Sequence, residues 1–211
     1  MKKYLFLWAG LLVLTVGLVT AQTNEHAESS GHAESSGSYK ELYESGIPFG
    51  IFLDQAEKRK EMWHNNFGNG VVPNSIITRL QSIDSSFYLL AVAIDGCSDS
   101  VNTIPYLAHL ANASDHIQMR VVTPEAGREI METNRTPDDR ASTPTVLVLN
   151  SAFEEIGVFI ERPDALQKWA LGEGKELDSR SFMTAKFAWY DSDLGIQTMS
   201  EVLNIIEMNQ K

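Results

Sequence analysis

Residues 87–112 read FYLLAVAIDGCSDSVNTIPYLAHLAN, and this stretch decides the fold. Its first part, residues 87–94, is short, continuously apolar and bounded by turn residues, which is typical of a strand buried on both faces of a sheet. Asp95 and Gly96 end this run. In residues 101–112, apolar side chains recur with the i, i+3, i+4 and i+7 spacing of a helix face. The stretch therefore predicts a buried central strand, a short turn and a helix.

Cys97 is the only cysteine of the chain and lies in this turn, at or just before the start of the predicted helix. The unpaired backbone N–H groups and the positive dipole end of a helix stabilise a thiolate there, and the thiolate is the nucleophilic form of cysteine. A free cysteine is also often buried as an inert small hydrophobe. The polar neighbours Ser98 and Asp99 favour a functional loop. We therefore interpret Cys97 as a candidate reactive thiol, with the inert thiol as the alternative.

The first 21 residues have the pattern of a signal peptide. Lys2 and Lys3 form a basic region, residues 4–19 are mostly apolar, and Val19-Thr20-Ala21 is a small-residue cleavage site. We expect an exported protein, periplasmic or extracellular, with an uncleaved N-terminal membrane anchor as the alternative. No later stretch approaches the ~20 apolar residues that span a bilayer, so we expect no integral membrane segment after cleavage.

Residues 26–37 are a perfect tandem repeat of the hexapeptide HAESSG. Serine, glycine and glutamate cannot bury a core, so residues 22–37 are predicted to be a disordered linker. The repeated histidines, His26 and His32, preorganise no metal site on such a linker. We therefore expect neither a metal nor another cofactor.

The chain is acidic, with 17 basic and 28 acidic residues. Removal of Lys2 and Lys3 with the signal peptide leaves 15 basic residues and a formal net charge of −13. This charge argues against nucleic acid and anionic membrane surfaces as partners. Because one cysteine cannot form an intramolecular disulfide, apolar burial must hold the domain together.

Residues 38–211 alternate helical and strand patterns, as expected of one α/β domain. The predicted helical segments are an N-terminal extension at 38–63, then 73–82, 101–112, 125–133, 164–171 and 198–208. The predicted strands are 87–94, 117–122, 145–149 and 155–160. A strand, a helix and a second strand imply a parallel pair, whereas 145–149 and 155–160 are close enough for an antiparallel hairpin. The sheet should thus be mixed, and residues 175–197 have no clear assignment.

This order of elements, with Cys-x-x-Ser at a helix start, resembles the thioredoxin superfamily over about residues 75–170. Cys97 matches the nucleophilic cysteine of the family's Cys-x-x-Cys, and Pro105 matches a helix-kinking proline. Thr143-Pro144 leads into a strand and resembles the cis-proline segment that faces the active cysteine, with an ordinary trans proline as the alternative. The resemblance implies a thioredoxin-like fold, in which a central mixed sheet is flanked by helices.

The segment Gly96-Cys97-Ser98-Asp99-Ser100, with Ile104-Pro105-Tyr106-Leu107 and Arg162-Pro163, is similar to a bacterial thioredoxin-like group that bears Trp-Cys-Gly-Asp-Ser or Trp-Cys-Gly-Asp-Cys. Ser100 replaces the resolving cysteine, Gly96 stands where a tryptophan is expected, and Ala91 stands where many thioredoxins bury an acidic residue. Cys97 can thus form a mixed disulfide but cannot release the partner by intramolecular attack. The Asp99 carboxylate opposes thiolate formation, while the helix terminus favours it. The alternative is that Asp99 or Ser98 simply caps the helix.

The resemblance implies a monothiol thiol–disulfide exchange protein whose partners are protein or small-molecule thiols and disulfides. In this interpretation Cys97 is the nucleophile, Ser100 donates a hydrogen bond to its sulfur, and an external thiol resolves the mixed disulfide. The expected substrate contacts are Gly96, Ser98, Asp99, Thr143 and Pro144. One alternative is a degenerate thioredoxin fold that serves as a non-catalytic binding or scaffold module. A third interpretation is a covalent dimer linked through Cys97.

Overall fold

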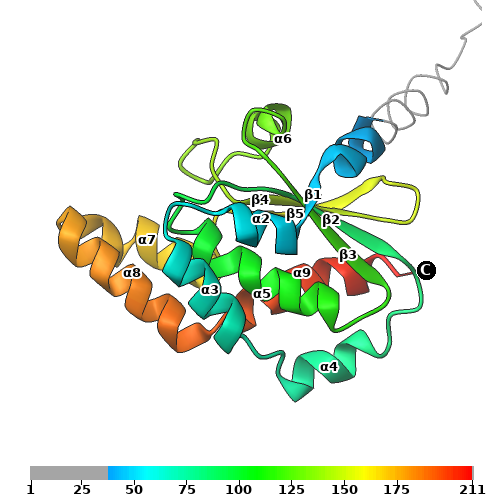
Figure 1. Ribbon diagram of the computed structural model, residues 1–211. Helices are drawn as coiled ribbons and strands as arrows, with labels where there is room; N and C mark the ends of the chain where they lie inside the picture. The colour runs from blue at the N-terminus through cyan, green and yellow to red at the C-terminus, as the bar shows by residue number, and fades with distance from the viewer. Residues whose placement is uncertain (1–37, 211) are drawn as a thin grey trace, which may run out of the picture.

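The computed structural model describes residues 38–210 and places β2 (Phe87–Val92) at the centre of a five-stranded sheet (Figure 1). The other strands are β1 (Ile47–Pro48), β3 (Ile117–Val122), β4 (Thr145–Leu149) and β5 (Glu155–Ile160). Their order is β1-β3-β2-β4-β5. Strand β2 is parallel to β3 and antiparallel to β4, and β4 pairs antiparallel with β5. The predicted central strand, parallel pair and hairpin are confirmed.

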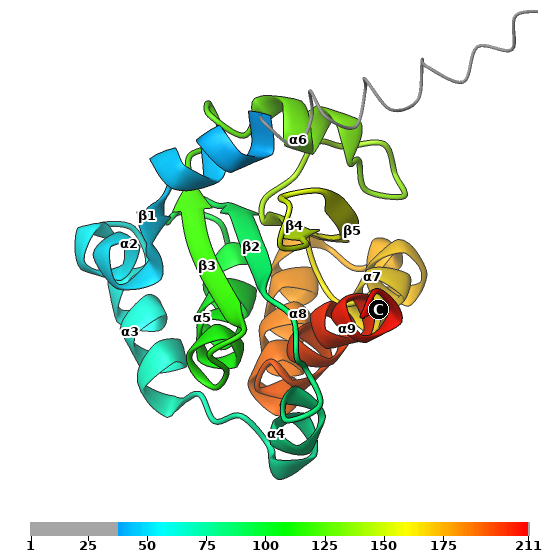
Figure 2. The same cartoon turned by 90° about the vertical axis from the view of Figure 1, so that its right-hand side faces the viewer.

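Helices cover both faces of this sheet (Figure 2). One face carries α2 (Phe49–Gln55), α3 (Lys60–Asn69), α5 (Ser100–Asn112) and α9 (Ile196–Met208), with α4 (Asn74–Leu80) against α9. The other face carries the helical residues 38–45 and α6 (Arg128–Thr133). Beyond β5, the chain forms α7 (Asp164–Leu171), the 3-10 helix η1 (Glu173–Glu176) and α8 (Ser179–Asp193). The described residues thus form the expected thioredoxin-like α/β arrangement, with helical segments at their N-terminal end.

Strand β2 is buried on both faces because its alternating side chains enter two separate apolar clusters. Leu89 and Ala91 belong to the larger cluster beneath α5 and α9. Leu90 and Val92 belong to the smaller cluster, together with Tyr43 from the N-terminal helical residues. The continuous apolar pattern of the strand follows from this double burial.

The N-terminal extension predicted at 38–63 is helical, but it is interrupted at two places. The chain leaves the helical conformation at Gly46, and Ile47–Pro48 then pair with β3 as β1. A Cβ at Gly46 would lie 3.1 Å from Val122 Cγ1, so this position favours a residue without a side chain. A second interruption comes at Arg59, whose left-handed φ of 53° precedes α3. Helical periodicity alone missed both interruptions.

The signal peptide predicted at residues 1–21 and the linker predicted at 22–37 lie outside the described residues. Within residues 38–210, no helix combines the length and the apolar character needed to cross a membrane.

Gly195 connects α8 to α9 in a conformation that only glycine adopts readily. Its φ is +75°, and a Cβ there would lie 2.1 Å from Cγ of Tyr106. Tyr106 lies on α5 and is only 4% exposed, so its ring has little room to move. The close approach of this turn to α5 thus depends on the missing side chain.

We predict that Gly195→Ala lowers the free energy of unfolding by about 2 kcal/mol or more, because it adds both backbone strain and overlap with a buried ring. The matched control is Gly68→Ala in α3, where an added Cβ meets no atom within 4 Å. This control should raise stability by about 0.5–1 kcal/mol, since alanine favours the helix. Chemical denaturation measures both variants, and equal stabilities would contradict the assignment.

Glu201, on α9, gives the fold a pH dependence. Burial raises its pKa from 4.5 to about 7, and the nearby Asp164 and Asp193 carboxylates add to this effect. The Asp164 backbone N–H donates a hydrogen bond to Glu201 Oε1 at 2.9 Å, which lowers the pKa and offsets part of this rise. Because the pKa of Glu201 is higher in the folded state than in the unfolded state, the protonated carboxyl favours folding. This contribution to stability is fully present below the ordinary pKa of 4.5 and is lost as the pH rises through about 7.

We predict that Glu201→Gln, which keeps a neutral acceptor for the Asp164 N–H, flattens this dependence. The melting temperature of the variant relative to wild type should increase steadily between pH 4.5 and about 7. Thermal unfolding of both proteins across this range is the measurement. A constant difference would show that Glu201 titrates normally in the folded state.

Candidate functional site

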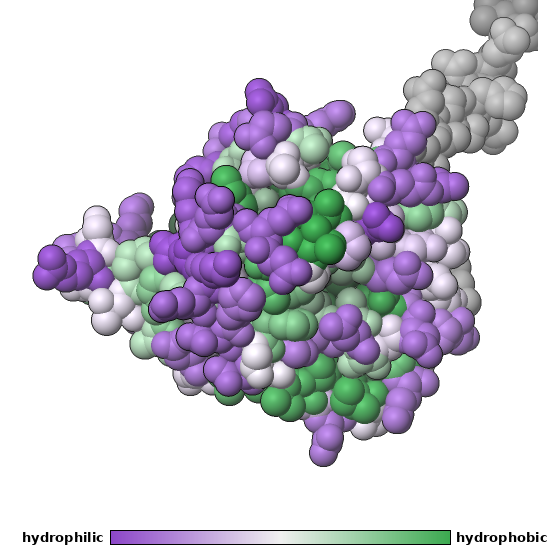
Figure 3. Space-filling view, viewed as in Figure 1, coloured by the Kyte–Doolittle hydropathy of each residue, from purple (hydrophilic) through white to green (hydrophobic). Residues whose placement is uncertain are grey.

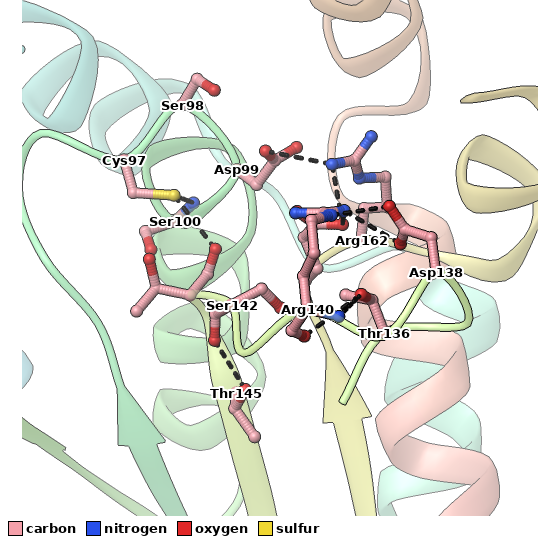
Figure 4. A network of polar contacts seen from close by, with 12 residues as sticks. Cys97, Ser98, Asp99, Ser100, Thr136, Asp138, Arg140, Ser142, Thr145 and Arg162 are labelled. Atoms are coloured by element: carbon pink, nitrogen blue, oxygen red, sulfur yellow. Dashed lines mark hydrogen bonds and ion pairs between the residues drawn. The ribbon is translucent and has the colours of Figure 1, made fainter. Parts of the chain in front are cut away.

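Cys97 lies in the loop between β2 and α5, half-buried, with its sulfur directed at the segment that precedes β4 (Figure 4). Its S–H donates to the Thr143 carbonyl oxygen, with 3.0 Å between Sγ and O. The Thr143–Pro144 peptide bond is cis, as the resemblance implied. The structure therefore brings Cys97 together with Thr143 and Pro144, although Cys97 and Thr143 are 46 residues apart in the chain.

Ser100 contacts the sulfur differently from the prediction. Its backbone N–H donates to Cys97 Sγ at 3.4 Å. Its hydroxyl is fully buried and has no hydrogen-bond partner among the described residues. The expected donation from the side chain is thus replaced by donation from the first turn of α5, the kind of group that stabilises a thiolate.

Asp99 is only 5% exposed and faces away from solvent. It occupies the N-cap position of α5, but its side chain makes no capping hydrogen bond. Instead, Lys186 Nζ lies 2.8 Å from Asp99 Oδ2, and the Tyr190 hydroxyl donates to Oδ1 at 2.8 Å. Arg162 Nη2 lies 3.6 Å from Oδ2. The capping alternative for Asp99 is therefore wrong, and its carboxylate is held by two hydrogen bonds and by an ion pair with Arg162.

Ser98 is bound from two sides. Lys186 Nζ donates to its hydroxyl oxygen at 2.7 Å, and the Asn102 side-chain amide donates to its carbonyl oxygen at 2.7 Å. Its hydroxyl makes no capping bond to α5. The ammonium group of Lys186 thus joins the two residues between Cys97 and Ser100 to helix α8.

Tyr190 acts as a neutral donor in this cluster. Burial raises its pKa well above the ordinary value, and the charges of Asp99 and Cys97 raise it further, whereas Arg162 lowers it. The hydroxyl therefore keeps its proton and its hydrogen bond to Asp99 through the physiological pH range.

The cluster continues toward the surface as a chain of alternating charges (Figure 4). Arg162 Nη2 binds the buried Glu161 at 2.8 Å, and Arg140 binds the same carboxylate through both terminal nitrogens at 3.0 and 3.1 Å. Arg140 Nε also binds Asp138 at 2.6 Å, which contributes to lowering the pKa of Asp138 to about 2. The Glu161 N–H donates to the Pro144 carbonyl oxygen at 2.7 Å, so the charges connect to the cis-proline segment.

The segment before and within α3 covers the other side of the loop. Trp63, fully buried, donates from its indole N–H to the Asp95 carbonyl oxygen at 2.9 Å. Arg59 Nε donates to the Gly96 carbonyl oxygen at 2.9 Å. A Cβ at Gly96 would lie 3.0 Å from Lys58 Cδ, so the missing side chain leaves room for this lysine. Burial opposes ionisation of Asp95, but backbone N–H groups, the first that of Lys58, lower its pKa.

Sequence reasoning missed Lys186, Tyr190, Trp63 and Arg59 as parts of the site. Lys186 and Tyr190 lie in the unassigned segment 175–197, and they are the two residues of α8 that are buried. The signal available was their spacing of four, which places both on one face of a helix. Arg162 entered the prediction only as part of a motif.

The arrangement provides one half-buried thiol beside a cis-proline backbone, within a shell of paired charges. Among residues 38–210, no group of three or more histidine, cysteine, aspartate or glutamate side chains is placed to hold a metal ion.

Two solved structures are similar to this chain. A protein of unknown function from Pseudomonas aeruginosa has a TM-score of 0.62 and 24% identity, with coverage of 82% of this chain and 98% of its own. An HIV epitope-scaffold protein has a TM-score of 0.63 and 24% identity, with coverage of 82% and 99%. At this identity the likeness shows the fold alone.

No curated protein matches this chain. The family model described as thioredoxin matches residues 31–180, which include Cys97, the cis-proline segment and the whole sheet. The chain belongs to the thioredoxin family.

Proposed function

We propose that the protein is an exported monothiol member of the thioredoxin family, in which Cys97 exchanges disulfides with partner thiols. The observation that carries the proposal is the contact between the half-buried Cys97 sulfur and the Thr143 carbonyl oxygen at the cis-proline segment. An inert core cysteine would be surrounded by apolar side chains, whereas this sulfur has a backbone acceptor and a backbone donor.

In the exchange, the Cys97 thiolate attacks one sulfur of a partner disulfide. The new S–S bond joins Cys97 to the partner, the old S–S bond breaks, and the second partner sulfur leaves as a thiolate that takes a proton from water. Ionisation of Cys97 removes the S–H donor from the Thr143 carbonyl, which is then free to accept from the partner's backbone. The Ser100 N–H remains on the Cys97 sulfur, where it favours the charged form.

In this proposal the substrate contacts Thr143, Pro144 and Gly96. Ser98 lies at the edge of this contact surface. Asp99 is buried in ion pairs, so we assign it no contact with the substrate. Ile94 precedes the loop and is 40% exposed, which adds an apolar contact to a partner. The face of the molecule shown in Figure 3 is largely hydrophilic, with apolar patches between polar side chains.

Release of the partner needs a second, external thiol, since Ser100 cannot attack the mixed disulfide. The N-terminal pattern of Lys2, Lys3 and a following apolar run supports action in the periplasm or outside the cell. Such compartments contain protein and small-molecule disulfides that Cys97 can attack.

We predict that glutathione disulfide converts Cys97 into a persistent mixed disulfide, and that the reaction is faster than with a cysteine of the unfolded chain at neutral pH. The physical reason is thiolate stabilisation at the start of α5. Intact-mass spectrometry measures the yield, and alkylation of the remaining free thiol at successive times measures the rate. Cys97→Ser is the control and should take up no label.

An unreactive Cys97 in the folded wild type would contradict the proposal and favour the non-catalytic binding module. A disulfide-linked dimer in place of the mixed disulfide, seen on a non-reducing gel, would favour the Cys97-linked dimer.

We predict that Ser100→Cys adds disulfide-reductase activity that the wild type lacks. Position 100 is adjacent to the Cys97 sulfur, with its backbone nitrogen 3.4 Å from Sγ, so a thiol there can attack a mixed disulfide. Insulin reduction with dithiothreitol as the reductant should rise from the uncatalysed background in wild type to a rate proportional to the variant's concentration. A variant that folds and forms a disulfide between Cys97 and the introduced thiol, yet stays inactive, would contradict the assigned site.

A further inference from the structure

We propose that Lys186 and Tyr190 of α8 are positioning residues for Cys97, which hold the Cys97–Ser100 turn in place and neutralise Asp99 beside the reactive sulfur. This inference rests on the proposed function, because it assigns residues that act on the same thiol through Asp99. It gives a role to helix α8, which the sequence pattern left unassigned.

The geometry fixes the turn through its two middle residues. Lys186 is 2% exposed, and its ammonium group lies 2.7 Å from Ser98 Oγ and 2.8 Å from Asp99 Oδ2. Tyr190, one helical turn later, occupies the other Asp99 oxygen. These three bonds connect a loop near residue 98 to a helix almost 90 residues later in the chain. Motion of α8 would therefore displace the turn that contains Cys97.

The Asp99 carboxylate lies two residues after the nucleophile. A bare carboxylate there opposes thiolate formation, and low exposure strengthens the effect because water does not screen it. The Lys186 ammonium and the tyrosine hydroxyl offset this charge at contact distance. Other charged groups around the loop are Arg162 from the residues after β5, Lys58, Arg59 and Asp95.

Stability alone gives no reason for this arrangement. A buried ion pair costs desolvation on both partners, and apolar residues of similar volume are often as stabilising. Breaking the pair from one side is different, since it leaves one buried charge without its partner. The pair is therefore better explained by its place beside Cys97 than by its contribution to folding.

The test is a pH titration of the thiolate by its ultraviolet absorbance, with the Cys97→Ser spectrum subtracted. Lys186→Met removes the cation and keeps the aliphatic stem. We expect the midpoint of the thiolate titration to rise by about half a pH unit or more, which is about a threefold change in the ionisation constant. The matched control is Lys168→Met, which alters an exposed lysine on α7 and should leave the midpoint unchanged.

Two further variants separate charge from structure. The double variant Asp99→Asn with Lys186→Met removes both charges and should return the midpoint to the wild-type value, whereas a purely structural role would leave it displaced. Lys186→Arg should also keep a wild-type midpoint. If Lys186→Met does not fold, Tyr190→Phe tests the same carboxylate, because it removes one donor and should shift the midpoint in the same direction by a smaller amount.

Unchanged midpoints in Lys186→Met and Tyr190→Phe would overturn the inference, and so would a double variant that stays displaced. Failure of the proposed function gives a different result. In that case wild-type Cys97 forms no mixed disulfide with glutathione disulfide, while its absorbance titration still responds to Lys186→Met.

Discussion

Burial of β2 on both faces is the constraint on which the site depends. Apolar clusters cover this strand on both sides, so the polar residues that follow it lie beyond its C-terminal end. These residues form the loop with Cys97. Val92, the last residue of β2, pairs with Thr145, the first residue of the antiparallel β4. The loop after one strand and the segment before the other therefore meet, so the register of two core strands places the Cys97 sulfur against Thr143.

Because this loop is covered, its buried charge needs partners of opposite sign, and the charge network provides them. Helices α3 and α8 lie over the loop, so Asp99 has little access to water, and a buried carboxylate without donors would be costly. Lys186 and Arg162 supply positive charge, Glu161 offsets Arg162, and Arg140 offsets Glu161. The alternation ends at Asp138, near solvent. Each buried charge in this network thus has a neighbour of opposite sign. These pairs connect the end of β5 and the cis-proline segment to the loop that contains Cys97.

The sequence predicted what depends on local periodicity and missed what depends on long-range contacts. The strand at 87–94, the helix after Cys97 and the helix at 164–171 have clear patterns, and α7 has the predicted bounds. The break at Gly46 arises from pairing with β3, which no pattern within 38–63 reveals. Helix α8 buries only Lys186 and Tyr190, so it lacks an apolar stripe. Both of these buried side chains bind the Asp99 carboxylate, a partner some 90 residues away in the chain, which no local pattern reveals.

The position of the acidic group also limits how the Cys97 proton can leave. In many thioredoxins an acidic residue is buried six positions before the nucleophile, but here Ala91 lies there, within the apolar cluster and fully buried. A carboxylate at Ala91 would have no polar partner among its neighbours Val121 and Val146. Asp99 is the nearest carboxylate in sequence after Cys97, and its oxygens already accept from Tyr190 and Lys186. The Cys97 sulfur bonds instead to the backbone of Thr143 and Ser100, so in the proposed exchange Asp99 is not placed to accept the Cys97 proton.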